Sequence, residues 1–497
     1  MIHLINIYSE KDFQKLSHFT DDKRLLELLK LFSIPITIAI ESNYSDPEYK
    51  DIYYNFYASK YQQYKKYCHR IVIFDGVVTE QELFEKSENI QKKLIGIVIV
   101  RPFKQGVIGR TYIDPKYLFT NNLFVRTTKF IIGFAGRKLF IDAFQFSSQD
   151  GEYMSCAETV LWMILHYYGA RYKEYRSALP HEILDIVDDS YHQRVLPSSG
   201  LNVIHSSVVL KKFGFSSRVY YRIFKNKTPK SESLFKRAFH YYVESGIPLM
   251  VGIKLQSDNL IQGHAVACIG HGDLQYEKFE KIKIGNHNII NSADFVKQYV
   301  FMDDNKLPYE LKEFDNFDYK YDETIIKYFI VPLYKRIFLE AADAEKIFYI
   351  ILENEMIGLD NLKDIKDDLV IRIFLTTARN YKSSRFEGSS DKYAKKLYIN
   401  LPLPKFVWVC EITTLQLHKQ NKAIGEIVLD ATASKSRKKF DELILVRYQE
   451  KIGYKTFEEN IYQLVCRLKA LNLNKDKNFK MFDKNLIKGN ANGRNSK

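Results

Sequence analysis

The most constraining feature of this chain is a cysteine that stands where a polar loop gives way to an apolar helix. The loop runs from Ser148 to Ser155, and Cys156 follows it. Beyond the cysteine, apolar residues recur at three- and four-residue spacing, which predicts a helix that begins at Cys156. Unpaired backbone amides at a helix N-terminus carry a partial positive charge and favour a thiolate there. The sequence therefore predicts a nucleophilic cysteine at the mouth of a cleft.

Two later segments supply partners for such a thiol. His264 follows Gly263 at the start of a β-type run, and a predicted strand at 299–302 ends on Asp303, Asp304 and Asn305. A histidine on a rigid strand can accept the thiol proton, and a third residue can orient the far nitrogen of its ring. Asp303 fits that third role best. Asp304 and Asn305 are close alternatives, because all three also suit a polar turn.

A glutamine precedes the cysteine by a few residues. The side-chain amide of Gln149, together with the backbone N–H of Cys156, would form an oxyanion hole. Such a pair of donors stabilises the transition state of acyl transfer by about 3–4 kcal/mol. Gln149 is therefore the fourth predicted catalytic residue.

These motifs resemble the papain-like cysteine peptidase superfamily, and within it they are most similar to the bacterial C39-like peptidases. The resemblance rests on Gln149, on Cys156, on the Gly-His-Ala-Val run at 263–266 and on the strand that ends in Asp303. It covers roughly residues 140 to 330. It implies a fold in which the cysteine helix packs on an antiparallel sheet. The Cys-Gly-Ser-Cys-Trp signature of the cathepsin branch is absent, and a charged insertion near residues 273–290 separates the histidine from the acid.

The predicted fold class is α+β, with a papain-like core between two flanking α/β regions. A chain of 497 residues exceeds the usual size of one domain. We expect an N-terminal mixed region at 1–138, a catalytic domain at 139–330 and a C-terminal α+β region at 331–470. Residues 471–497 are expected to form a basic, disordered tail. Strands at 249–254, 264–269, 281–284 and 299–302 should form the antiparallel half of the cleft, and helices are expected at 49–67 and 368–377.

Composition narrows the setting. No apolar run is long enough for a membrane span, and the first ten residues lack the features of a signal peptide. Five scattered cysteines form no CxxC pair and no disulfide framework, which indicates a reducing cytoplasm. The net charge of +14 invites nucleic-acid binding, but basic clusters in predicted loops are more often solvated faces. We therefore expect a cytoplasmic bacterial protein without membrane or nucleic-acid partners.

The resulting functional hypothesis is a thiol hydrolase that cleaves a peptide, isopeptide or amide bond through an acyl-enzyme on Cys156. It needs no metal or other cofactor, and its substrate is a protein or peptide. Ser199, Gly200 and Gly263 would line the substrate groove, and the C-terminal region would recruit a partner protein. Two alternatives stay open: transglutaminase-like acyl transfer, and a papain-like module that binds or senses without turnover.

Overall fold

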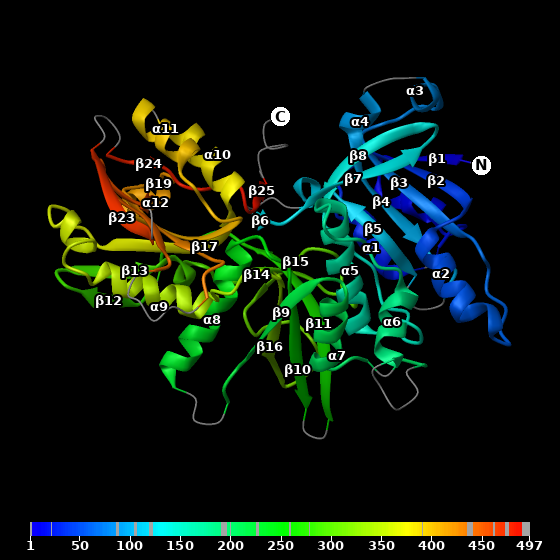
Figure 1. Ribbon diagram of the computed structural model, residues 1–497. Coiled ribbons are helices and arrows are strands. Elements are labelled where there is room, and N and C mark those ends of the chain that lie inside the picture. The colour runs from blue at the N-terminus through cyan, green and yellow to red at the C-terminus, as the bar shows by residue number, and fades with distance from the viewer. Residues whose placement is uncertain are drawn as a thin grey trace.

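Three sheets organise the chain. The computed structural model describes residues 2–20, 22–85, 89–103, 107–118, 123–189, 196–198, 200–224, 228–257, 260–277, 279–389, 391–434, 441–460, 463–472 and 477–489. In Figure 1 the N-terminal sheet lies at the right, the central sheet at the bottom and middle, and the C-terminal sheet at the left. All strand pairs within them are antiparallel except one, and helices pack on the sheets, so the fold is α+β.

The N-terminal sheet has five strands in sequential order. They are β1 (Ile2–Ile7), β2 (Ile36–Tyr44), β3 (Cys68–Asp75), β4 (Leu94–Val100) and β5 (Ile108–Ile113). The connections carry α1 (Lys23–Lys30), α2 (Pro47–Asn55), α3 (Glu80–Phe84) and α4 (Asn89–Lys93). The hairpin of β7 (Thr128–Phe134) and β8 (Arg137–Ala143) follows and shares a buried apolar cluster with this sheet. Buried and exposed residues alternate along β7, as in a strand with one face on a core.

The central sheet carries the predicted cysteine and histidine elements. Its main path is β15 (Glu310–Glu313), β14 (Gln298–Met302), β11 (Leu260–His271), β10 (Leu249–Ser257), β16 (Glu323–Tyr334) and β9 (Phe215–Tyr221). The helix α5 (Cys156–Arg171) packs on β11, and alternate residues of β11 share a core with α5 or with α8 (Pro229–Glu244). The helices α6 (Pro180–Asp188) and α7 (Val203–Lys212) pack beside α5. A helix on an antiparallel sheet therefore positions the cysteine.

The C-terminal sheet runs β12 (Lys281–Ile284), β13 (His287–Asn291), β17 (Leu369–Thr377), β18 (Phe406–Thr414), β20 (Gly425–Asp430), β21 (Leu443–Tyr448), β22 (Lys451–Asn460) and β23 (Gln463–Asn472). The pair β13–β17 is parallel. The remaining helices of this region are α9 (Ala341–Leu352), α10 (Ala378–Gly388), α11 (Lys392–Asn400) and α12 (Leu415–Lys419), and β19 (Lys422–Ala423) pairs with β24 (Phe479–Lys480). Two sheets thus share one stretch of chain, because the insertion after β11 supplies β12 and β13 to the C-terminal sheet.

Three sequence-based element predictions were wrong. Residues 281–284 do not join the sheet of the cleft, since β12 pairs only with β13 among the described strands. The helix expected at 368–377 is the strand β17, which lies between β13 and β18 and is buried along most of its length. The helix expected at 49–67 ends at Asn55, and beyond it the rings of Tyr57 and Tyr64 both pack on Phe103.

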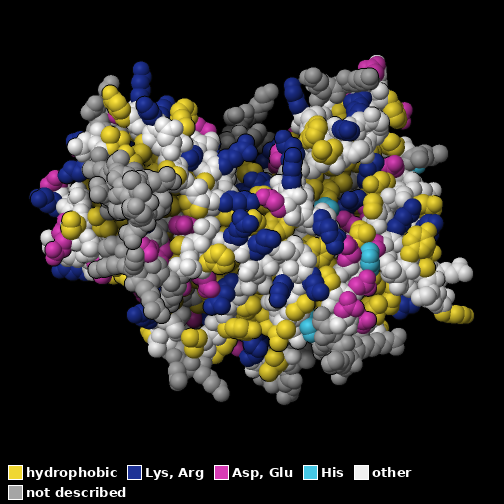
Figure 2. Space-filling view, viewed as in Figure 1, with side chains coloured by type: hydrophobic (Ala, Val, Ile, Leu, Met, Phe, Trp, Pro, Cys, Tyr) yellow, Lys and Arg dark blue, Asp and Glu magenta, His cyan; other side chains and the backbone are white. Residues whose placement is uncertain are grey.

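The expectation of a disordered tail from residue 471 needs correction as well. Residues 477–489 are described, and β25 (Ile487–Gly489) pairs with β6 (Leu123–Val125), which in turn pairs with β11. Phe479, Phe482 and Asn485 are buried. Apolar side chains in a basic segment thus anchor it to the core, and residues 490–497 lie outside the described residues. On the face in Figure 2, Lys and Arg side chains are concentrated across the middle, so the positive charge is not confined to this segment.

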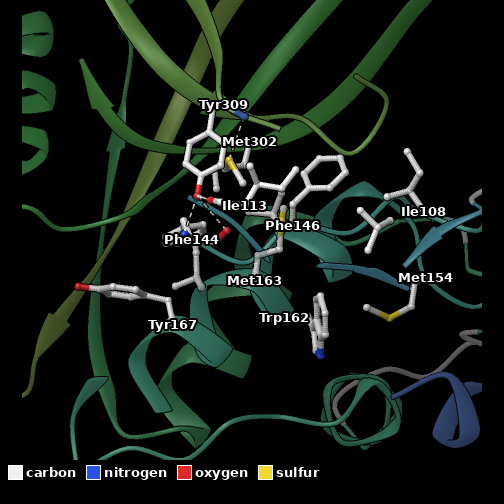
Figure 3. Packing of buried hydrophobic residues seen from close by; sticks show 14 of the residues in the cluster. Ile108, Ile113, Phe144, Phe146, Met154, Trp162, Met163, Tyr167, Met302 and Tyr309 are labelled. Carbon is white, nitrogen blue, oxygen red and sulfur yellow. Dashed lines mark hydrogen bonds between the residues drawn. The ribbon is translucent and has the colours of Figure 1, made fainter. Parts of the chain in front are cut away.

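Tyr309 joins the central sheet to the N-terminal region. Its side chain is 1% exposed, and its hydroxyl accepts a hydrogen bond from the Phe144 N–H (2.7 Å) and lies 3.0 Å from the Ile113 carbonyl oxygen (Figure 3). Its own N–H lies 3.3 Å from the Met302 sulfur. Met302 precedes Asp303 in the chain, so these contacts fix the strand end that carries the predicted acid.

Tyr309→Phe should therefore lower the free energy of unfolding by about 1–3 kcal/mol, because the Phe144 N–H and the Ile113 carbonyl lose a buried partner. Chemical denaturation would measure the loss. Tyr61→Phe is the matched control, since Tyr61 is fully exposed and should change stability by less than about 0.5 kcal/mol. Equal effects of the two substitutions would contradict a structural role for the Tyr309 hydroxyl.

Candidate active site

Cys156 is the first residue of α5. Ser155 caps the helix with extended backbone angles, and the helix continues for 16 residues through Arg171. Every side chain from Ala157 to Leu165 is buried, so this part of α5 is embedded on all sides. Cys156 is partly exposed, whereas Cys68, Cys268 and Cys410 are buried. Among the cysteines whose side chains are described, Cys156 alone combines access to solvent with a helix N-terminus.

His264 lies between the thiol and a carboxylate. It is carried by β11, is 6% exposed, and its Nε2 lies 2.9 Å from Asp303 Oδ1. The Cys156 side chain contributes to the raised pKa of His264, which places the thiol beside the ring. Because Nε2 faces Asp303, Nδ1 is the nitrogen available to the thiol. The structure therefore brings three of the four predicted catalytic residues together, with a hydrogen bond between His264 and Asp303.

Asp303 is held by donors from two loops, one that follows β14 and one that follows β15. Its Oδ1 accepts the Asn305 N–H (3.0 Å), and its Oδ2 accepts the Tyr319 hydroxyl (2.6 Å). The Tyr319 hydroxyl also lies 3.0 Å from His264 Nε2. Of the three candidates for the third position, Asp303 is thus the one whose carboxylate contacts the imidazole, and Asn305 contributes its backbone.

Asp304 occupies a different environment from its neighbour. It is fully buried, and its Oδ1 lies 3.8 Å from His264 Nε2, beyond hydrogen-bond distance. Neither of its carboxylate oxygens has a hydrogen-bond partner, although its backbone carbonyl accepts from Arg24 (3.3 Å). His264, Asp303 and Asp304 present ligand atoms that all lie within 4.8 Å of one another. The sequence analysis anticipated no such group of ligand atoms.

Burial and hydrogen bonding shift the pKa values of His264 and Asp303 in opposite directions. Burial alone would lower the pKa of His264, but hydrogen bonds with Asp303 and Cys156 and the two nearby carboxylates raise that pKa well above its ordinary value. Burial would raise the pKa of Asp303, yet the bonds from His264 and Tyr319 bring it below normal. Asp304 lacks such bonds, so burial raises its pKa to about 7. The geometry therefore favours a charged His264–Asp303 pair.

Gln149 lies on the far side of the same network. Its Nε2 donates a hydrogen bond to Asn305 Oδ1 (2.7 Å), and the Asn305 side chain also bonds to Tyr319. A glutamine amide has two N–H donors, so one is still available to a substrate oxygen. Asn305 thereby connects the predicted oxyanion residue to the group that orients His264.

The predicted groove residues divide into three cases. Gly200 lies at the start of α5: a Cβ there would meet Ser155 Oγ at 3.5 Å, and its φ of +87° suits a residue without a side chain. Gly263 is exposed, with open space around it. Ser199 lies outside the described residues. Gly200 therefore lies beside Ser155, which caps the cysteine helix, and Gly263 directly precedes His264 in the chain.

Three residues near the site carried no signal that the sequence reasoning could use. Glu158, on the first turn of α5, is fully buried and accepts hydrogen bonds from the hydroxyls of Ser155 and Ser198. Tyr319 contacts both His264 and Asp303 from a loop far along the sequence. Tyr328 of β16 lies over Gly252, where a Cβ would meet the tyrosine ring at 2.3 Å. Burial raises the pKa of Tyr328, and the nearby Cys156 side chain raises it further. Tyrosine is abundant in this chain, so no single one stands out by composition.

Sequence comparison adds no relative to this picture. No protein-family model matches the chain, and no curated protein is significantly similar to it. In the part of the chain that the structure describes, no helix has both the length and the apolar character needed to cross a membrane. Geometry and chemistry therefore carry the functional argument.

The unpaired carboxylate of Asp304 predicts a pH-dependent stability. In the unfolded chain it ionises near pH 3.9, whereas in the folded protein it ionises near pH 7, so between these values the folded state holds an extra proton. The free-energy cost of ionising the buried Asp304 carboxylate is therefore absent below about pH 4 and fully present above about pH 7. Asp304→Asn should therefore stabilise the protein relative to wild type by on the order of 4 kcal/mol more at pH 8 than at pH 4.

Urea unfolding at the two pH values would measure this difference. Asp360→Asn is the control, because Asp360 is exposed and the same comparison should give no change with pH. A pH-independent effect of Asp304→Asn would show that the carboxylate is ionised and stabilised in the folded state.

Proposed function

We propose that the protein is a cysteine hydrolase that cleaves a peptide, isopeptide or amide bond through an acyl-enzyme on Cys156. The observation that carries the proposal is the convergence of Cys156, His264 and Asp303, in which His264 bonds to Asp303 and the partly exposed thiol lies beside the ring at the N-terminus of a buried helix. A helix end and an adjacent imidazolium both favour thiolate. A buried structural cysteine needs neither, which argues against an inert role for this one.

The chemistry follows from the positions of the groups. Cys156 and His264 react as a thiolate–imidazolium pair in which the thiol proton is held on the ring, and the thiolate attacks the carbonyl carbon of the substrate. The imidazolium then donates that proton to the leaving amine, which departs and leaves a thioester on Cys156. Water attacks the thioester with His264 as general base, releasing the acid product and restoring the thiol. Asp303 holds the ring and stabilises the imidazolium throughout.

The tetrahedral intermediate needs donors for its oxyanion. The Cys156 backbone N–H, the first of helix α5, and the second N–H of Gln149 are the donors we assign. The bond from Gln149 to Asn305 fixes the amide before substrate arrives. Donors that are positioned in advance stabilise developing charge without the cost of reorganisation.

A papain-like core of the C39-like type belongs to the same proposal. It is supported by a cysteine-bearing helix that packs on an antiparallel sheet and by the order cysteine, histidine, aspartate along the chain. Acyl transfer to an amine would use the same residues, with the amine replacing water. A binding module without turnover would have no use for the thiol–imidazole bond, so the enzyme is the better-supported hypothesis.

The first test is the reactivity of the thiol toward iodoacetamide, followed by mass spectrometry at Cys156 across pH. Wild type should react with Cys156 faster than His264→Ala does below about pH 7, because a helix N-terminus and an adjacent imidazolium favour the thiolate. His264→Ala should shift the reaction to the range of an ordinary thiol, near about pH 8.5. Cys156→Ala should abolish the fast reaction, and Cys68→Ala, a buried cysteine, should not.

An ordinary thiol profile in wild type would overturn the proposal. Wild type and His264→Ala would then be alkylated at the same rate, and the proximity of the two side chains would be structural.

Gln149 can be tested separately from thiol activation. Alkylation by iodoacetamide is a displacement at carbon and forms no oxyanion, whereas hydrolysis of a chromogenic ester passes through one. Gln149→Ala should lower kcat for ester hydrolysis by about 10²–10³-fold and leave the alkylation rate of Cys156 unchanged. Asn305→Ala provides the comparison, because loss of its side chain should affect kcat through the placement of Gln149 and Tyr319. If Gln149→Ala slowed both reactions equally, the glutamine would act by organising the site rather than by binding the oxyanion.

A further inference from the structure

The buried carboxylate of Asp304 has no part in the proposed reaction. Both of its oxygens lack hydrogen-bond partners, although the residue is fully buried next to His264. A buried carboxylate without a partner is costly, and such groups in folded proteins are paired, protonated or bound to a cation. The arrangement of the neighbouring groups distinguishes between these outcomes.

The local charges do not balance around Asp304. Asp303 and Asp304 together carry two negative charges when ionised, and a protonated His264 supplies one positive charge. Arg24 reaches the backbone carbonyl of Asp304 and not its carboxylate. A divalent cation bound by a neutral imidazole and two carboxylates would bring the sum to zero.

The distances also suit a small transition-metal ion. His264 Nε2 lies 2.9 Å from Asp303 Oδ1 and 3.8 Å from Asp304 Oδ1, and all three ligand atoms lie within 4.8 Å of one another. A tetrahedral ion with bonds of about 2.1 Å sets its ligands about 3.4 Å apart. The observed separations lie on both sides of that value, so small side-chain movements would complete the site.

Outer contacts of the kind found around metal ligands are already present. Asp303 accepts hydrogen bonds from the Asn305 N–H and the Tyr319 hydroxyl, which orient its carboxylate. Tyr319 is itself partly exposed, and its hydroxyl lies 3.0 Å from His264 Nε2. The Tyr319 side of the site is therefore a route by which an ion could reach the imidazole.

We propose that His264, Asp303 and Asp304 form an inhibitory binding site for a divalent ion of the zinc class. One imidazole nitrogen with two carboxylates suits Zn²⁺ or Co²⁺ better than Ca²⁺ or Mg²⁺, which prefer oxygen ligands alone. The ion takes the Nε2 lone pair, and the proton that Nε2 held goes to solvent. Cys156 is not a ligand, which separates this site from a thiolate–imidazole metal site.

The inhibitory consequence rests on the proposed function, whereas the binding site does not. A neutral imidazole whose Nε2 is bound to a cation carries its remaining proton on Nδ1 and has no lone pair there, so it cannot accept the thiol proton and form the imidazolium that stabilises the thiolate. The ion also occupies the Asp303 oxygen that would stabilise the imidazolium. Bound metal should therefore slow both alkylation of Cys156 and hydrolysis.

Titration of chelator-treated full-length protein with Co²⁺ and Zn²⁺ tests the site, by absorption and by calorimetry. Wild type should bind one ion, and calorimetry in buffers of different ionisation enthalpy should show release of at least one proton. Asp304→Asn and His264→Ala should each weaken binding by more than about 100-fold, since each loses a ligand rather than an outer contact. Cys156→Ala should bind within about threefold of wild type, and so should the surface control Asp360→Asn.

The outcomes separate the two proposals. If Cys156→Ala abolished binding and Asp304→Asn did not, the ion would sit between thiol and imidazole, and this assignment would be overturned. Equal binding by Asp304→Asn and wild type would mean adventitious binding elsewhere and would overturn it too. The proton count is measured on wild type, so a value near zero would contradict Nε2 ligation even if Asp304→Asn did not fold. Tight binding that leaves an ordinary, slow thiol unaffected would support the metal site and contradict the hydrolase.

Discussion

The pairing of buried charges around His264 is the interaction on which the site depends. An imidazole that is 6% exposed and two carboxylates that are almost fully buried cannot all ionise in isolation, because burial disfavours each charge. The charge of Asp303 is stabilised by hydrogen bonds with His264, Tyr319 and Asn305, whereas the carboxylate oxygens of Asp304 have no hydrogen-bond partner. The same constraint that makes Asp303 suitable for orienting the ring leaves a second carboxylate beside it without a partner. The proposed catalytic role and the proposed metal site therefore have the same origin, which is the burial of two carboxylates beside one imidazole.

A second buried network determines how the central and C-terminal sheets meet. Arg372 of β17 bonds to Glu244 at the end of α8 and to Glu411 of β18, and Glu244 also bonds to His271 of β11. Arg385 continues the network to Glu411 and Glu426. The backbone of Phe482 both donates to Glu411 and accepts from Arg372. The C-terminal segment is consequently part of this network, and β11, which carries His264, is connected to it through His271.

Much of the site could be predicted from sequence because its signals are local. A loop-to-helix change at Cys156, a Gly-His start to a strand and a strand ending in acids are each readable within about ten residues. Each position was then found in the expected kind of element. The choice of Asp303 over Asp304 could not be made in that way. Asp303 and Asp304 both follow the end of β14, and which carboxylate bonds to the imidazole depends on the turn that begins there and on the pairing of β14 with β11.

The errors in the fold have a common cause, which is pairing between distant segments. Residues 369–377 form a strand because β13 and β18 pair on either side of them, and β-branched residues such as Val370, Ile371 and Ile373 suit that position. The strand at 281–284 joins the C-terminal sheet for the same reason. Basic residues after 471 suggest a tail, yet Phe479, Phe482 and Asn485 are buried against partners contributed by distant parts of the chain. Charge in sequence describes the exposed residues of such a segment and not the few that anchor it.

Asn305 shows how the two halves of the proposed chemistry are coupled. Its side-chain oxygen accepts from Gln149, its side chain bonds to Tyr319, and its backbone N–H donates to Asp303. Movement of this one residue would displace the oxyanion donor and the orienting carboxylate together. A substrate whose carbonyl oxygen accepts the second N–H of Gln149 would accordingly affect the position of Asn305, and through it that of Asp303. An ion bound at Asp303 would fix the loop that carries Asn305, and would thereby restrict the movement of the Gln149 amide.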